Sequence, residues 1–548
     1  MLFVSSSRKK TSILACLVPI FFLGFVLYKN LINIPTGDDI YVLEMFNLLK
    51  TSDSWWEKLR IIFAQHNEHR IVITRLFALF QYGLFGYIDL RWWLIAGNIC
   101  LVFVTLLFFM NLKNSPWLII PVAFIIICPA SNTLYAMQNA NLFSVVFSIA
   151  SLHFSLSEHS KKIPFFTFLF TLLAIFSNGG GFVGLAIIGG VFFFQKRYQL
   201  LVLWILFGVF IFSGYFFNYE KIYRHSSWHL LFEQLPQAAQ FLFAFLGSIA
   251  FLPKLTLVTG VVFIGVSVYA LYRRYYFQNP FVFLCLIYGL SIAGLTSLTR
   301  YEHGLSTALS ERYAIYSMLL AACMVIIVYD HFDAHLRYQK YVYAALCLLC
   351  VSLNLKYVTL HLRNPEGRKL ALKSKIENYH LNNSGFNCLE ISTLNKLAKN
   401  GFYKYHLDKP IHNQAYYDSL NHSSIERITV HIDTFYQTKE NLHFIGKILN
   451  PIAQIEAISQ INHRLLVIHN NATPFDCTQN ELTAPRNNET AILDMELENN
   501  HHKVNLPTFA FTIPKKHFLK GEYTIYFLFM NDNPVNHPPI KSNIVFHL

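Results

Sequence analysis

Two adjacent carboxylates, Asp38 and Asp39, follow Gly37 just after the first long apolar segment of the chain. Carboxylates crowded in this way repel each other, which raises one of the two pKa values and suits a general base. Two such groups at a membrane face are costly unless they are solvated, paired or used in chemistry. The alternative is a water-facing pair at the start of a helix near residues 41–49.

A second polar cluster lies between apolar residues and consists of Gln65-His66-Asn67-Glu68-His69-Arg70, followed by Arg75. On a helix, His66, His69 and Arg70 would share one face, at spacings of three and four residues. The HExxH spacing of zinc enzymes is absent and no third ligand stands nearby, so a zinc site is not indicated. The cluster is interpreted either as functional or as the solvated face of an interfacial helix.

A third cluster contains two arginines, in Arg300-Tyr301-Glu302-His303-Gly304 and in Ser310-Glu311-Arg312-Tyr313. Arginine on the outer side of a membrane runs against the usual distribution of basic residues, and binding an anionic headgroup is one reason for it. The alternative is local neutralisation, of Arg300 by Glu302 and of Arg312 by Glu311.

A fourth group supplies amides and hydroxyls suited to sugar hydroxyls, although such residues also commonly cap helices. It comprises Asn132, Tyr135, Gln138, Asn139 and Asn141, with Ser177 and Asn178 on a later turn. The triple glycine 179–181 that follows lacks the GxxxxGK[ST] context of a nucleotide-binding loop.

The composition indicates what kind of fold must position these residues. Of 548 residues, 54% are hydrophobic and only 14% are charged, with 51 Phe, and the mean hydropathy is +0.37. Soluble proteins carry about 25% charged residues. We therefore expect a mainly α, polytopic transmembrane bundle, and we exclude a soluble enzyme, a coiled coil and a disordered scaffold. The net charge of +13 comes from basic clusters between apolar runs, so nucleic acid is not expected as a partner.

The apolar runs predict about eleven spans, within a range of ten to thirteen, if 76–88 and 236–251 lie at the interface instead of crossing. The predicted spans are 11–31, 91–112, 116–130, 137–156, 163–177, 179–194, 198–217, 254–272, 280–298, 312–329 and 340–358. This count places the basic clusters in the cytoplasm, together with the amino terminus, and the four polar groups outside.

The chain is expected to divide into a transmembrane domain, 1–358, and an outer domain, 359–548. The first outer loop would comprise 32–90. In the outer domain, 360–440 shows mixed helical patterns and 441–548 alternates as strands do, which predicts an α+β domain ending in a small β-sandwich. Cys388 and Cys477 lie in this polar part and would pair only in an oxidising compartment.

Together, the first outer loop and the late arginines resemble those of the GT-C class of integral-membrane glycosyltransferases. The resemblance covers roughly 11–358 and rests on short stretches: Gly37-Asp38-Asp39, His66 to Arg70, the interfacial 76–88, and Arg300 to Tyr313. No subfamily is indicated, and 360–548 matches no pattern that we can assign.

This resemblance implies transfer of a sugar from a polyprenyl-phosphate carrier to a cell-envelope glycan or lipid-linked acceptor. Asp38 or Asp39 would act as base, with His66, Glu68 and His69 orienting the acceptor or tuning the pair. Arg300, Arg312 and Arg70 would stabilise the phosphate, with Arg75, Glu302, Gln138 and Asn139 also binding substrate. A divalent cation, Mg²⁺ or Mn²⁺, is compatible with this chemistry but not required, because arginine can stabilise the same charge.

The alternative function is a non-enzymatic transporter or flippase of a lipid-linked glycan. Such a protein would place charged residues in mid-span, whereas here the ionisable groups lie at span ends. The composition fits a bacterial inner membrane, with membrane lipids as the surrounding partner.

Overall fold

The structure is a computed structural model, in which the chain forms two compact units, residues 1–372 with 396–405 and residues 373–395 with 406–548. The helical part is described for residues 6–35, 38–112, 115–129, 134–157, 163–220, 234–250, 253–333, 336–365 and 388–403, and the remainder for seven strands. The division differs from the predicted boundary at 358, because α18 continues past it and a short later segment returns to the first unit.

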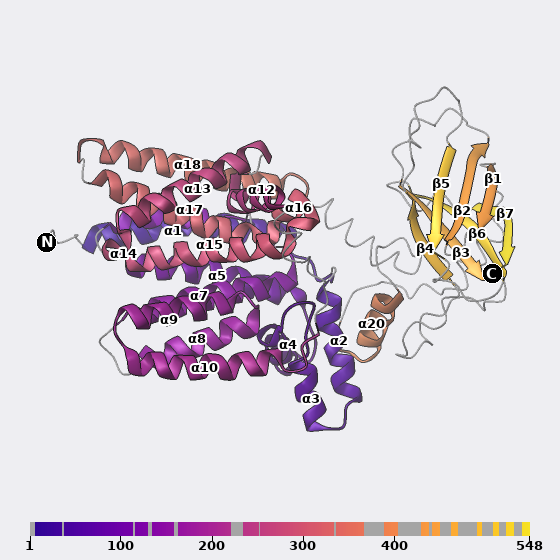
Figure 1. Ribbon diagram of the computed structural model, residues 1–548, viewed down its shortest axis with the longest axis horizontal. Coiled ribbons are helices and arrows are strands. Elements are labelled where there is room, and N and C mark those ends of the chain that lie inside the picture. The colour runs from indigo at the N-terminus through magenta and orange to yellow at the C-terminus, as the bar shows by residue number, and fades with distance from the viewer. Residues whose placement is uncertain are drawn as a thin grey trace. The chain divides into compact units, whose positions relative to one another are not determined.

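The first unit is a bundle of helices, most of them roughly parallel to one another (Figure 1). In chain order they are α1 (Ser6–Asn30), α2 (Asp38–Thr51), α3 (Trp55–Ile62), α4 (Val72–Phe85), α5 (Leu90–Asn111), η1 (Pro116–Leu118), α6 (Ile119–Ile126), η2 (Ala136–Gln138), α7 (Asn139–Ser155), α8 (Ile163–Ser177), α9 (Gly181–Phe194), α10 (Tyr198–Phe216), α12 (Leu235–Leu246), η3 (Ser248–Ala250), α13 (Pro253–Tyr272), α14 (Tyr275–Gln278), α15 (Pro280–Arg300), η4 (Tyr301–His303), α16 (Gly304–Ala308), η5 (Glu311–Tyr313), α17 (Ala314–Asp333) and α18 (Leu336–Leu362).

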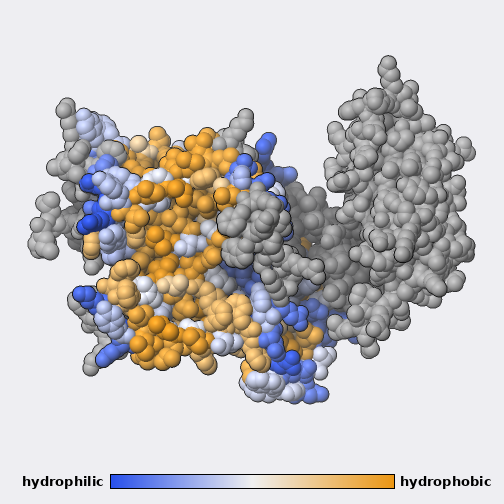
Figure 2. Space-filling model, viewed as in Figure 1, coloured by the Kyte–Doolittle hydropathy of each residue, from blue (hydrophilic) through white to orange (hydrophobic). Residues whose placement is uncertain are grey.

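Among the described residues, seven helices are long and apolar enough to cross a membrane, as the composition predicts. They are Thr11–Asn30, Leu90–Asn111, Tyr198–Phe216, Leu255–Tyr272, Pro280–Ala308, Glu311–His331 and Tyr338–Leu362. Figure 2 shows hydrophobic residues forming a band across this unit, with hydrophilic residues at both ends. The chain is therefore a mostly helical membrane protein.

The remaining predicted spans coincide with shorter helices, so the count of eleven stays a prediction. Residues 116–130, 163–177 and 179–194 contain apolar helices of 10–17 residues, and 137–156 contains α7. The two segments predicted to lie at the interface correspond to α4 and α12, which are also short. Helix α4 ends at Phe85, before the predicted 88, because Gly86 adopts a left-handed conformation (φ +73°) that glycine tolerates.

Helix α17 forms the centre of the bundle and α10 lies at its periphery. Within the apolar window of each helix, 89% of residues are buried in α17 but only 17% in α10. A helix that is apolar all round either packs on every side or faces lipid. The exposed Leu206, Val209 and Phe210 of α10 therefore belong to the lipid-facing surface.

Two glycines allow α12 and α13 to cross with their backbones in contact. A Cβ atom on Gly247 would lie 1.9 Å from the Thr256 carbonyl oxygen, and one on Gly260 would lie 2.1 Å from the Phe243 carbonyl oxygen. Only glycine fits at such a crossing. The Oγ of Ser317, on α17, accepts a hydrogen bond from the backbone of η3 and donates one to the last turn of α12.

The second unit contains two antiparallel sheets, one of three strands in the order β1-β2-β5 and one of four in the order β4-β3-β6-β7. The strands are β1 (Thr429–Gln437), β2 (Asn441–Leu449), β3 (Asn462–His469), β4 (Thr490–Met495), β5 (Thr508–Pro514), β6 (Glu522–Met530) and β7 (Ile540–His547). The β-sandwich stays a prediction, since the side chains of these strands lie outside the described residues. The pairing of Cys388 with Cys477 also stays a prediction, since their side chains lie outside the described residues.

Candidate functional site

The predicted site residues gather at one end of the helical unit. Figure 1 shows α2, α3, α4 and α16 at the end opposite the amino terminus and α14. This end brings together the first residues of α2, the segment 65–70, the segments around 137–141 and 178–180, the residues after α10, and the turns between α15 and α17. Asn132, from the fourth predicted group, lies outside the described residues.

The helix expected near residues 41–49, as part of the alternative interpretation of the acidic pair, is present, but it begins at the pair itself, because Asp38 and Asp39 are the first two residues of α2. Their environments differ sharply. The side chain of Asp39 is buried and its Oδ1 accepts the backbone N–H of Met137 at 2.7 Å. The side chain of Asp38 is 50% exposed, and its Oδ1 lies 3.9 Å from Nε2 of His66. The helix dipole favours both carboxylates at this position.

Residues 66–69 form a tight turn, and the predicted helical face of His66, His69 and Arg70 is wrong. The backbone N–H of His66 donates to the His69 carbonyl at 2.7 Å, and the reverse bond measures 2.9 Å. Asn67, inside the turn, has φ +48°, a left-handed conformation that asparagine adopts more readily than most residues. The helical spacing is present in the sequence, but contacts from distant residues fix another conformation.

Arg70 is the main contact that fixes this turn. Its guanidinium donates to three backbone carbonyls, those of Phe63, Tyr215 (Nε to O 2.5 Å) and Phe217. The backbone N–H of Arg70 donates to the Tyr215 hydroxyl at 3.0 Å. Burial lowers the pKa of Arg70. Arg70 therefore clamps the first loop to the last turn of α10 and to Phe217, the residue that follows it.

Gln65 and Arg75 complete the support of the turn. Gln65 exchanges side-chain to backbone hydrogen bonds with Glu220, at 2.7 and 2.9 Å. Arg75 is buried and donates to the carbonyls of Ile62, at 3.0 Å, and Ala64. Burial, assisted by the charge of Arg70, lowers the pKa of Arg75 to about 10. The contacts of both predicted substrate-binding arginines in the first loop, Arg70 and Arg75, are thus largely internal.

Both histidines of the turn are half-buried beside charged groups, with one buried nitrogen on each ring. His66 Nε2 and His69 Nδ1 have no hydrogen-bond partner in the described structure. Burial lowers the pKa of His66, against the effect of Asp38 and with that of Arg75. Burial also lowers the pKa of His69 to about 4, opposed by Glu68. Both imidazoles are therefore neutral near pH 7 and can accept a hydrogen bond.

Glu68 joins the first loop to the end of α15, 232 residues later in the chain, through an ion pair with Arg300. Arg300 also donates to the hydroxyl of Tyr313 at 3.1 Å. The two charged side chains are 21% and 22% exposed. The predicted local pair of Arg300 with Glu302 is not what the structure shows, because the charge of Arg300 is directed to Glu68.

Arg312 and Glu302 lie on the neighbouring turns. Arg312 is half-buried, its guanidinium carbon lies 5.2 Å from the ring centroid of Tyr313, and its Nε has no hydrogen-bond partner in the described structure. Glu302 is exposed, and its Oε1 lies 3.5 Å from the hydroxyl of Tyr301. Arg312 thus offers a buried, unused donor at this end of the bundle.

The amide residues form a connected row beside the turn. Asn141 donates to Gln138 Oε1 at 2.5 Å and accepts from Asn178 at 2.6 Å. Asn139 is buried and its Oδ1 accepts from Thr74 Oγ1 at 3.0 Å, whereas its Nδ2 has no partner in the described structure. The predicted grouping of these amides is therefore present in the structure.

The triple glycine serves close packing. A Cβ atom on Gly179 would lie 3.1 Å from Nδ1 of His69, and one on Gly181 would lie 2.4 Å from the backbone nitrogen of Ile175. Side chains at these positions would push α8, α9 and the turn apart.

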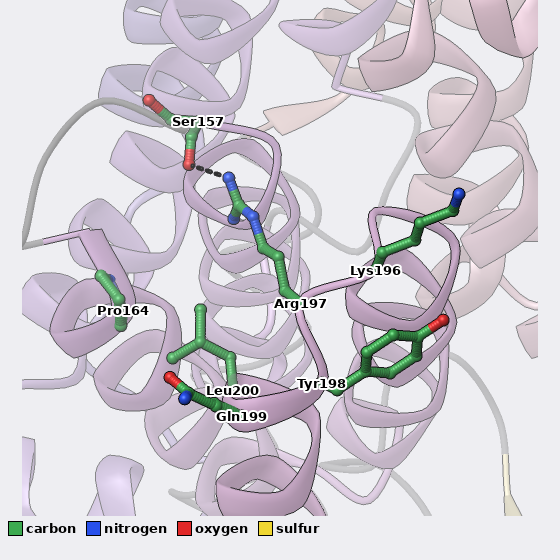
Figure 3. Close-up of a pocket in the computed structure, with 7 residues that line it drawn as sticks. All are labelled: Ser157, Pro164, Lys196, Arg197, Tyr198, Gln199 and Leu200. Carbon is green, nitrogen blue, oxygen red and sulfur yellow. Dashed lines mark hydrogen bonds between the residues drawn. The ribbon is translucent and has the colours of Figure 1, made fainter.

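The described residues also contain an open pocket of about 420 Å³ at the turn between α9 and α10. Figure 3 shows Arg197 reaching the backbone of Ser157 there, while Lys196 points away. The pocket is lined by Ser157, Pro164, Lys196, Arg197, Tyr198, Gln199 and Leu200, and by none of the predicted site residues. It contains one of the basic clusters assigned to the cytoplasm.

The described part of the site contains no preformed metal centre. No group of three or more His, Cys, Asp or Glu side chains among the described residues is arranged to hold an ion, and one oxygen of Asp39 is already used by the Met137 N–H.

Sequence reasoning missed Tyr215, Tyr219 and the Met137 N–H as partners of the site. Tyr219 donates its hydroxyl to the Glu68 carbonyl at 3.1 Å. Tyrosines at the ends of apolar runs are common and backbone groups leave no mark in a sequence, so no signal could have identified them.

What the arrangement can do follows from its exposed and unpartnered groups. It offers the exposed carboxylates of Asp38 and Glu302, two neutral imidazoles, a paired arginine and, in Arg312, a donor without a partner among the described residues. Together these groups can accept a proton and bind an anion. Comparison of the chain with protein-family models, curated proteins and solved structures found no match.

Proposed function

We propose that this protein transfers a sugar from a polyprenyl-phosphate donor to a cell-envelope acceptor, by direct displacement with Asp38 as general base. The acceptor oxygen attacks the anomeric carbon, the bond from that carbon to the phosphate oxygen breaks, and the hydroxyl proton passes to Asp38. The lipid phosphate leaves as an anion and needs charge stabilisation more than protonation.

The contrast between Asp38 and Asp39 is the observation that carries this proposal. A general base must reach the hydroxyl that it deprotonates, within about 3 Å. Asp38 is half exposed beside His66, whereas Asp39 is buried against the Met137 N–H. We therefore assign catalysis to Asp38 and positioning of the start of α2 to Asp39. His66, in the neutral tautomer that carries its proton on Nε2, would orient the Asp38 carboxylate.

Arg312 is the preferred phosphate ligand in this proposal. Arg70 and Arg75 direct their guanidinium groups to backbone carbonyls, so they support the loop instead of the substrate. Arg300 is shared between Glu68 and Tyr313. Among the described residues, the Nε atoms of Arg75 and Arg312 both have no hydrogen-bond partner, but Arg75 already donates to two backbone carbonyls. A phosphate oxygen would therefore satisfy the Nε of Arg312, with a charge-assisted bond.

The membrane topology is part of the proposal. With eleven spans, α4 and α12 would lie at the interface, the basic turns such as Lys196-Arg197 would face the cytoplasm, and the site would face outward. A bacterial inner membrane supplies polyprenyl-phosphate sugars on that face, and the β-rich unit would lie on the same side.

The test compares surface-glycan mass profiles in a deletion strain carrying wild-type protein, Asp38→Asn, Asp39→Asn or Asp53→Asn at matched membrane levels. Asp53 is the control, because it is exposed in the same loop but not placed in the site. We expect one sugar to disappear on deletion and to return with wild type and Asp53→Asn, but not with Asp38→Asn. The mass difference would name the sugar.

Full restoration by Asp38→Asn would contradict the assignment of the base. If both Asn variants at 38 and 39 restored the glycan, the non-enzymatic alternative, transport of a lipid-linked glycan, would replace glycosyl transfer.

A further inference from the structure

A segment far along the chain belongs structurally to the first loop. Residues 396–403, here called the strap, fall within the helical unit, although sequence analysis assigned them to the outer domain. The strap contains the last turn of α20 (Cys388–Lys399) and the residues that follow it. Gly401, with φ +75°, ends this helix, and the N–H of Phe402 donates back to the Leu397 carbonyl at 3.0 Å.

Hydrogen bonds connect the strap to three parts of the first loop. Asn400 accepts from Lys50 Nζ at 2.8 Å and donates to Asn47 Oδ1 at 3.2 Å, both on α2. The N–H of Ile88, just before α5, donates to the Phe402 carbonyl at 2.7 Å. The Tyr403 hydroxyl donates to the Asn33 carbonyl, between α1 and α2, at 2.5 Å.

Aromatic packing adds to these bonds. The ring centroid of Phe402 lies 5.5 Å from that of Phe46 on α2 and 5.3 Å from that of Tyr82 on α4. Leu397, Phe402 and Tyr403 are 0%, 9% and 1% exposed. A segment buried to this degree is part of the packed core of the loop.

The strap holds the end of α2 opposite to its two carboxylates. The start of α2 is fixed by the bond from Asp39 to Met137, and its later residues Phe46, Asn47 and Lys50 contact the strap. Between these ends α2 also buries Ile40, Val42 and Leu43, so the strap is one of its supports. Without the strap the later turns of α2 lose their polar and aromatic contacts, and the helix that carries Asp38 can tilt.

We propose that the strap positions Asp38, with Phe402 and Tyr403 acting as positioning residues for the proposed transfer reaction. This inference rests on the proposed function only for its catalytic consequence. The structural part of the inference, that residues 396–403 hold α2 in place, does not depend on the proposed function. It also explains why residues beyond the last apolar span would be needed for chemistry at the first loop.

The test uses amide hydrogen exchange and kinetics of the purified full chain. Phe402→Ala removes the ring contacts with Phe46 and Tyr82 and the contact of the ring with the Lys50 ammonium, at 5.8 Å. Tyr403→Phe removes the hydroxyl bond to Asn33, and Lys399→Ala changes an exposed residue as the control. We expect exchange in α2 to rise at least tenfold in Phe402→Ala, slightly in Tyr403→Phe and not in Lys399→Ala. Exchange in α7 should not change, which shows that the bundle is folded.

The kinetic measurement separates positioning from binding. The donor is a polyprenyl-phosphate derivative of the sugar identified by the glycan profile. Phe402→Ala should lower the rate at saturating donor at least tenfold. It should change the KM for the donor less than twofold, because the proposed phosphate ligands Arg300 and Arg312 lie on other elements. Phe402→Tyr, which keeps the ring, should restore the rate.

Two results would overturn the inference. Unchanged exchange of α2 in Phe402→Ala would show that the strap does not hold this helix. Faster exchange with an unchanged rate would show that α2 need not be fixed for catalysis. Failure of the proposed function is a separate result, because it appears as full glycan restoration by Asp38→Asn.

Discussion

The crossing of α12 and α13 makes a strong prediction for a single methyl group. In Gly260→Ala, the new Cβ would lie 2.1 Å from the Phe243 carbonyl oxygen. The obstructing atom belongs to the backbone, so no change of rotamer relieves the clash. The two helices must separate by about 1 Å or more, which is a severe form of overpacking.

The magnitude follows from what this separation disrupts. Overpacking of a tight core costs about 1–3 kcal/mol. Separation also strains the bonds from Ser317 Oγ to the Ile249 N–H and the Leu246 carbonyl, at 3.1 and 2.5 Å, each contributing about 1 kcal/mol. We therefore expect Gly260→Ala to lower the free energy of unfolding by about 3–5 kcal/mol.

Gly265→Ala is the matched control on the same helix. Among the described residues, no heavy atom outside the glycine's own stretch of helix lies within 4 Å of a Cβ at this position. Alanine is favoured over glycine in a helix interior by up to about 1 kcal/mol. The assay is thermal unfolding of the detergent-solubilised full chain, followed by Trp fluorescence. Gly260→Ala should lower the apparent Tm by about 5 °C or more relative to Gly265→Ala. Equal values for the two variants would refute the close crossing.

Three further predictions concern the first loop. Arg70→Lys removes the planar guanidinium that reaches three carbonyls, so it should lower the Tm by several degrees. Arg60→Lys, at an exposed position, should leave the Tm unchanged, and similar Tm shifts in the two variants would argue against the clamp. Below pH 6.5 the unfolded chain protonates His69, but the folded chain does so only near pH 4. The free energy of unfolding should therefore fall by about 3 kcal/mol as the pH drops from 6.5 to 4. His69→Asn should flatten this pH profile, and an unchanged slope would count against a neutral imidazole in the folded chain. Because Glu68 and Arg300 form an ion pair, Glu68→Gln and Arg300→Gln should each reduce sugar transfer in the glycan assay. The double variant should lose little more activity than either single variant, whereas additive losses would indicate independent roles.

Membrane-spanning helices could be predicted because their signal is local. Each of the seven long apolar helices coincides with a predicted span, since a segment that crosses lipid must carry its own apolar side chains and pair its own backbone. The helix expected near residues 41–49 is present for the same kind of reason, as acidic residues favour the first turn of a helix.

The site was less predictable because its decisive contacts are long-range and often involve backbone atoms. The helical face of His66, His69 and Arg70 was wrong because the carbonyls of Tyr215 and Phe217 hold the turn in another conformation. Residue types alone could not show that Arg70 serves the protein's own backbone while Arg312 keeps a free donor.

The division into two units also depends on long-range contacts that local sequence does not show. Composition changes near residue 360, which predicted a boundary there, yet residues 396–405 return to the helical unit. A short buried segment such as Phe402-Tyr403 has too few residues to alter the average hydropathy of its surroundings, so only its contacts show where it belongs.

The long sequence separations within the first loop have a consequence for biosynthesis. Arg300 follows Glu68 by 232 residues, and Tyr403 follows Asn33 by 370 residues. At synthesis rates of about 5–20 residues per second, Tyr403 is made roughly 20 to 75 s after Asn33. Insertion of the early helices and completion of the first loop are therefore separate events. A nascent chain that stops before residue 403 would hold its bundle helices in place, but its α2 would still lack the segment that fixes it.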